Sequence, residues 1–143
     1  MPLQLSLEPG PNSERANAQA VIQAAADQLG IDLDLSPVSL KQIDTIIESF
    51  RQQGETLADV ETALAGLACY VGEVFVNHAG GKWTSVAGGD GQPVMAILLP
   101  GGMTCFPSNK VPKRFEDGPQ DSVADFYQSM AAKELERGTA GND

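Results

Sequence analysis

Apolar residues are most concentrated between positions 57 and 76, where the sequence predicts one long helix. Residues 63–76 read ALAGLACYVGEVFV and carry a single charge, that of Glu73. Thr56 is a good N-cap, and Asp59 three positions later completes a weak capping box. A helix that is apolar on nearly all sides is buried between layers of other elements. We therefore predict that this helix is the shared core of the fold.

Glycines mark both the interior and the end of this predicted helix. Gly66 and Gly72 each cost about 1 kcal/mol in helix propensity, so we expect another backbone to approach the helix closely there. Gly80 and Gly81 supply residues that can leave a helix in a left-handed conformation.

Three amphipathic patterns predict further helices, each with one apolar side. They are a first helix capped by Asn12 or Ser13 and ending near Leu29, a second from Ser36-Pro37 to about Gln53, and a last helix capped by Asp121 or Ser122 and ending near Arg137. Leu3, Leu5 and Leu7 alternate with polar residues, so residues 1–11 are predicted to be either an edge strand or an extended arm. Residues 138–143 are predicted to be a frayed tail.

Between the long helix and the last one, the pattern changes to short apolar runs separated by glycine-rich turns. It predicts strands over residues 82–86, 93–99 and 103–106, joined as an antiparallel meander. The central run is apolar on both faces, with Val94, Ala96 and Leu98 on one and Met95, Ile97 and Leu99 on the other. We therefore expect the central strand to be covered on both faces.

The expected fold class is α+β, with three N-terminal helices, a three-stranded antiparallel sheet and a C-terminal helix. A chain of 143 residues is near the commonest size of a single domain, so residues 1–143 are predicted to form one. Residues 107–120 are predicted to be a long surface segment with local positive charge.

The net charge of −10 is distributed unevenly along the chain. Residues 1–73 carry a net charge of −8 and residues 74–143 one of −2, while the stretch from Lys82 to Arg114 is locally positive at +3. An acidic chain repels phosphate backbones, which argues against nucleic-acid binding. The acidic helical half is instead suited to a basic protein partner.

Two isolated cysteines, Cys69 and Cys105, do not form a disulfide scaffold and are expected to behave as small apolar residues. The sequence shows no signal peptide and no unbroken apolar run of about 18 residues. We therefore expect a cytoplasmic protein without membrane contact.

Two short motifs resemble those of a family of small uncharacterised bacterial domains. They are Tyr-Val-Gly-Glu-Val at residues 70–74 and Gly-Gly-Lys-Trp at residues 80–83, and the segment 110–127 is also similar to that family. The resemblance covers roughly residues 36–127. It implies a fold type and a bacterial origin, and it implies no reaction.

Glu73 is the strongest candidate for a role, because a charge in an apolar helix needs a partner when it is buried. Tyr70 and Asn77 share its side of the helix. Its candidate partners are the Trp83 indole, Lys82, Lys113 and Arg114. The structural interpretation is that Glu73 ties the long helix to the sheet and to the basic segment. The alternative is a ligand-contacting carboxylate or general base with a raised pKa.

The remaining chemistry points away from catalysis. One histidine, His78, and two scattered cysteines make no zinc set, Cys69 lies too far along the helix to pair with His78, and the glycine-rich turns match no nucleotide-binding motif. We expect no cofactor and no bound metal. The leading hypothesis is a non-enzymatic interaction module, of the immunity or accessory type, that binds a partner through an acidic surface. The alternative is a small ligand-binding domain or hydrolase with a pocket around Glu73, Tyr70 and Trp83.

The last helix presents Phe126, Tyr127 and Met130 as the only remaining cover for the second face of the sheet. One helix is about 10 Å wide, whereas three strands spaced about 4.8 Å apart span more. We therefore expect leftover apolar surface, and a homodimer formed through the sheet side or its edge together with the last helix.

Overall fold

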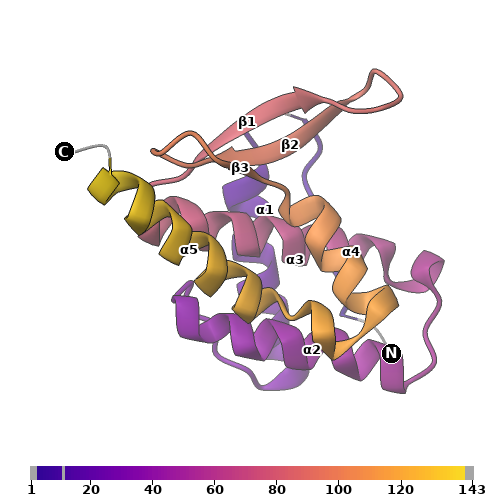
Figure 1. Ribbon diagram of the computed structural model, residues 1–143. Coiled ribbons are helices and arrows are strands. Elements are labelled where there is room, and N and C mark those ends of the chain that lie inside the picture. Colours follow the sequence, from indigo (N-terminus) through magenta and orange to yellow (C-terminus); the bar gives the residue numbers. More distant parts are fainter. Residues whose placement is uncertain (1–2, 11, 141–143) are drawn as a thin grey trace.

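The structure is a computed structural model that describes residues 3–10 and 12–140. Its helices gather on one side of a three-stranded antiparallel sheet, so the predicted α+β class is confirmed (Figure 1). The main helices are α1 (Glu14–Ala24), α2 (Leu40–Gln52), α3 (Leu57–His78), α4 (Pro107–Asp117) and α5 (Val123–Ala140). A π-helical turn (Ala25–Leu29) and two 3₁₀ turns (Pro37–Ser39 and Pro119–Asp121) complete the helical part. The strands are β1 (Lys82–Ala87), β2 (Pro93–Leu98) and β3 (Thr104–Cys105).

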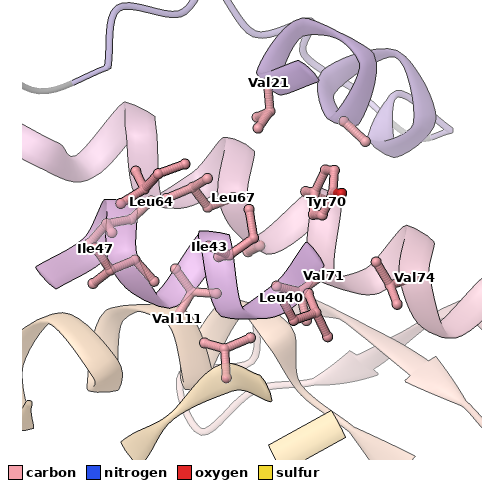
Figure 2. Packing of buried hydrophobic residues seen from close by; sticks show 14 of the residues in the cluster. Val21, Leu40, Ile43, Ile47, Leu64, Leu67, Tyr70, Val71, Val74 and Val111 are labelled. Atoms are coloured by element: carbon pink, nitrogen blue, oxygen red, sulfur yellow. The ribbon is translucent and has the colours of Figure 1, made fainter. Parts of the chain in front are cut away.

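The long helix α3 is the core element that its composition predicts. The Thr56 side chain accepts the Asp59 N–H while the Asp59 side chain accepts the Thr56 N–H, so the capping box is complete. Figure 2 shows α3 with Val21 of α1 on one side and the α2 residues Leu40, Ile43 and Ile47 on the other. Each of these four side chains is fully buried.

The N-terminal residues 3–10 form an extended arm that lies on the helices and pairs with no strand of the described sheet. Leu3 is buried, Leu5 packs against the core, and Leu7 is half-buried beside Gly66 of α3, so the alternation predicts the inward-facing residues correctly. Two side chains hold the arm in place. Asn17 of α1 accepts the Glu8 N–H and donates to the Glu8 carbonyl, and Gln28 makes the same pair of bonds with Gln4.

The prediction that residues 107–120 form a long surface segment is wrong, because most of these residues form helix α4. This helix begins with Pro107 at its first position, where the missing N–H costs nothing. Val111 and Phe115 are buried one turn apart and attach α4 to α3 and α2. Two helices therefore follow the sheet, where one was expected.

The meander is confirmed, with strand order β1-β2-β3. Trp83, Ile97 and Cys105 are paired across the three strands, so they share the face that packs on the helices. The opposite face carries Val86 and Leu98, which are 37% and 42% exposed. Ala96 of β2 lies on the same face and is fully buried, so the prediction of a central strand covered on both faces holds only in part.

The last helix begins where Ser122 predicts and continues to Ala140, three residues beyond the expected end. The remaining tail residues, 141–143, lie outside the described part. The aromatic side of α5 packs on α3. The Phe75 ring contacts Phe126 and Tyr127 with centroid distances of 5.8 Å and 4.8 Å.

Candidate functional site

Glu73 and Trp83 form the one predicted pair that the structure brings together. The indole N–H of Trp83 donates to Glu73 Oε2 over 2.8 Å, and Glu73 is 5% exposed. The indole ring lies over Gly72, where an added Cβ would come within 2.1 Å of the ring. A side chain rather than a backbone therefore explains this glycine, and the same is true of Gly66. The pair ties α3 to the sheet, and none of the three predicted basic partners bonds to Glu73.

Tyr70 lies in the core and not beside Trp83, so the predicted pocket of Tyr70, Glu73 and Trp83 does not form. Its hydroxyl accepts the Leu35 N–H over 2.8 Å and shares a 2.6 Å hydrogen bond with the Ser39 hydroxyl. Burial raises the pKa of the Tyr70 phenol, while these two hydrogen bonds partly oppose that shift. Tyr70 thus fixes the connector between α1 and α2.

The other three candidates are dispersed. Asn77 is exposed near the end of α3. The Lys113 side chain is 59% exposed and lies 3.9 Å from Asp121. Arg114 is 4% exposed and faces α2, where it pairs with Asp44 at 3.2 Å and Glu48 at 2.9 Å. The basic segment therefore pairs with α2 and with Asp121.

The structure instead shows a groove that the sequence did not predict. It has a volume of about 680 Å³ and lies between the start of α1, the first half of α3, the sheet and the start of α4. The lining residues are Gly10, Ser13, Glu14, Leu57, Ala58, Glu61, Leu64, Ala65, Ala68, Cys69, Trp83, Met95, Ser108 and Pro112. Its surface is mainly apolar, and Trp83 is the only predicted site residue in it.

The charges in the groove are all of one sign. Among the described lining residues, Glu14 and Glu61 are carboxylates and none is Lys, Arg or His. Burial, together with the smaller effect of the nearby Glu14 carboxylate, raises the pKa of the Cys69 thiol to about 11. At neutral pH this thiol is protonated, so it is a poor nucleophile. The groove is thus equipped to bind a ligand with an apolar body and a positive charge.

Sequence reasoning missed the groove because four separate segments build it. On α3, Ala58, Glu61, Ala65 and Ala68 recur at helical spacing, which is the one signal that marks a common face. Three alanines and one glutamate on the same face of a mainly apolar helix would have indicated that no other element packs closely on this face.

Comparisons with known proteins add a likeness of fold. No protein-family model matches the chain, and no curated protein matches it by sequence. A crystal structure of a protein from Bacteroides thetaiotaomicron superposes with a TM-score of 0.63 at 20% identity. The match covers 91% of this chain and 47% of that one, so the present chain spans about half of its neighbour's length. At this identity the likeness shows the fold alone.

Two further observations concern the described residues only. None of the helices there is both long and apolar enough to cross a membrane. No group of three or more His, Cys, Asp or Glu side chains lies close enough to hold a metal ion.

Proposed function

We propose that this chain is a non-enzymatic interaction module that receives an apolar, positively charged segment of a partner protein. The observation that carries the proposal is the groove, whose surface is mainly apolar and whose charged lining residues are both carboxylates. Its α3 side runs from Leu57 to Cys69, about 18 Å at 1.5 Å per residue. That length suits a short helix laid into a groove, which is a common mode of peptide recognition.

Charge supports the same direction of recognition. The chain carries a net charge of −10, which attracts a basic partner over several ångströms and speeds its association. The acidic residues of α2 are less available, because Asp44 and Glu48 are already paired with Arg114. The groove, and not the acidic helical half as a whole, is therefore the preferred contact.

The test combines capture from a cell extract of the source organism with direct binding. Ala65→Trp fills the groove from an exposed position of α3, whereas Gln42→Trp adds the same bulk on the exposed side of α2. A partner that fits the proposal is captured by the parent and by Gln42→Trp and lost with Ala65→Trp. The purified partner should show the same order in titration calorimetry, with affinity falling as salt rises. Equal binding to both variants would place the contact elsewhere.

A small-ligand site is the second candidate, and the groove's dimensions favour it. Ligand pockets usually measure about 300–1,000 Å³ and have apolar walls with a few polar groups. A small-molecule screen by thermal shift decides between the two candidates when a hit is lost in Ala65→Trp and retained in Glu73→Gln. The hydrolase version of this alternative has no support in the groove, since neither Tyr70 nor Glu73 lines it.

We also propose self-association through the outer face of the sheet. Val86 and Leu98 lie exposed there, and β1 has one edge free of partners among the described strands. Exposed apolar residues on the outer face of a sheet support an interface of this kind.

A further inference from the structure

Glu14 occupies an unusual position in the groove. It is the first residue of α1, it lines the groove, and it is only 8% exposed. Within the described residues, no hydrogen bond or ion pair joins its carboxylate to another side chain. The start of a helix favours a negative charge, which makes a carboxylate tolerable there. The Glu14 carboxylate is not among the fully enclosed side-chain groups that lack a partner, so a group bound in the groove can reach it.

The surroundings of Glu14 define what would pair with it. Leu64, Ala68, Trp83 and Met95 supply apolar surface in the same groove. The Cys69 thiol is held protonated by burial and by the field of Glu14, so it adds no second charge. Trp83 already donates its N–H to Glu73, so it offers Glu14 no hydrogen bond.

We propose that the groove is a binding site for a primary ammonium group carried on an apolar chain, with Glu14 as its counter-ion. The ammonium donates hydrogen bonds to the Glu14 carboxylate, and the apolar chain lies along the alanine face of α3. A lysine side chain of a partner and a free alkylamine share this chemistry. That the ammonium group belongs to a lysine of a partner protein rests on the proposed function, whereas the binding of an ammonium group at Glu14 does not.

Trp83 provides a direct readout, because it is the only tryptophan in the chain and lies in the groove wall. The whole chain is titrated at pH 7 with n-octylammonium, n-hexylammonium, n-octanol and octanoate, and Trp83 fluorescence is followed. We expect saturable binding of octylammonium, about tenfold or more tighter than octanol, because charged hydrogen bonds are the stronger ones. Each removed CH₂ should weaken binding by up to about fourfold, and octanoate should not bind.

Glu14→Gln tests the counter-ion, and Glu61→Gln is the matched control at an exposed position of the same groove. Glu14→Gln should weaken octylammonium about tenfold or more and leave octanol binding unchanged. Glu61→Gln should alter octylammonium affinity by less than about threefold, since solvent screens an exposed carboxylate. Equal affinity of the parent for octanol and octylammonium, or an unchanged affinity in folded Glu14→Gln, would overturn the proposal.

A second measurement keeps the test decisive if Glu14→Gln does not fold. In the parent, the CH₂ next to the ammonium should show nuclear Overhauser contacts to the Glu14 side chain, and the terminal methyl should not. The reverse orientation would contradict the proposal. Displacement of a captured partner by octylammonium identifies a partner's lysine as the source. Octylammonium binding that leaves the partner in place supports the site with a free amine as its source, and it counts against the proposed function alone.

Discussion

Gly72 and Trp83 form a single packing unit at the scale of individual residues. The absence of a Cβ at Gly72 lets the indole pack closely against α3, and that position brings the indole N–H to Glu73. The two motifs at residues 70–74 and 80–83 thus have a structural explanation, namely the attachment of β1 to α3. A buried carboxylate that accepts an indole N–H needs no ligand to account for it.

The first prediction concerns this unit. Gly72→Ala places a Cβ 2.1 Å from the ring, so Trp83 must move and its bond to Glu73 must break. We expect a net loss of about 1–2 kcal/mol in the free energy of unfolding, because overpacking outweighs the gain in helix propensity. Trp83 emission should shift to the red as the ring becomes more exposed.

Gly66→Ala is the matched comparison for urea unfolding and fluorescence. Its new Cβ meets Leu5 Cδ1 at 2.6 Å, the end of a flexible side chain on the N-terminal arm. A smaller loss is expected there, with unchanged emission. Equal effects of the two substitutions would show that Trp83 does not constrain α3.

At the scale of elements, Asp44 of α2 acts as the cap of a helix that lies 79 residues further along the chain. Its carboxylate accepts the N–H groups of Val123 and Ala124 over 2.7 Å and 3.1 Å and the Ser122 hydroxyl over 2.7 Å. The same carboxylate pairs with Arg114 of α4. One side chain therefore holds α2, α4 and α5 together.

Asp44→Ala should accordingly be among the most damaging substitutions outside the apolar core. It removes three bonds at the start of α5 and leaves the buried Arg114 guanidinium short of a partner. We expect a loss of about 3 kcal/mol or more in the free energy of unfolding. Asp125→Ala, at an exposed position in the same turn, should cost less than about 1 kcal/mol. Chemical denaturation of both variants measures the difference, and similar losses would contradict the shared cap.

Glu48 makes the stability of the same contact depend on pH. The hydrogen bond from Arg114 lowers the pKa of Glu48 below its ordinary value of 4.5, and Arg51 acts in the same direction. A carboxylate whose pKa is lower in the folded state stabilises the fold above its unfolded pKa, and the contribution disappears as the pH falls through the folded value. The parent should therefore exceed Glu48→Gln in stability at pH 7, and the difference should shrink below about pH 4.5. Urea unfolding at several pH values measures this, and a constant difference would exclude Glu48 as the titrating group.

At the scale of the whole molecule, local signals predict local structure well. The capping box of α3, the Ser36-Pro37 helix start, the apolar stripe of α2 and the meander all follow from neighbouring residues. Helix α4 does not, because Pro107 and Pro112 are typical helix breakers, and few apolar side chains, Val111 and Phe115 among them, anchor the helix. Much of its support comes from distant residues of α2, such as Asp44 and Glu48, which lie 70 and 66 positions before Arg114 and bond to it. The groove could not be predicted from the sequence for the same reason: segments far apart in the chain build it, and each of them on its own resembles part of a core.

The outer face of the sheet leads to the last prediction. Two six-residue strands present an area of roughly 20 Å by 10 Å, far below the approximately 800 Å² per partner of a standard interface. The free edge of β1 or the neighbouring α5 must therefore contribute to the interface, and two chains of charge −10 repel one another.

We expect a weak homodimer whose population rises with salt, because salt screens that repulsion. Leu98→Lys should give single chains, whereas Val38→Lys, at a 72% exposed position away from the sheet, should dimerise like the parent. Light scattering at micromolar concentration measures the mass. A single-chain mass for the parent at both low and high salt would mean that this face stays exposed to solvent.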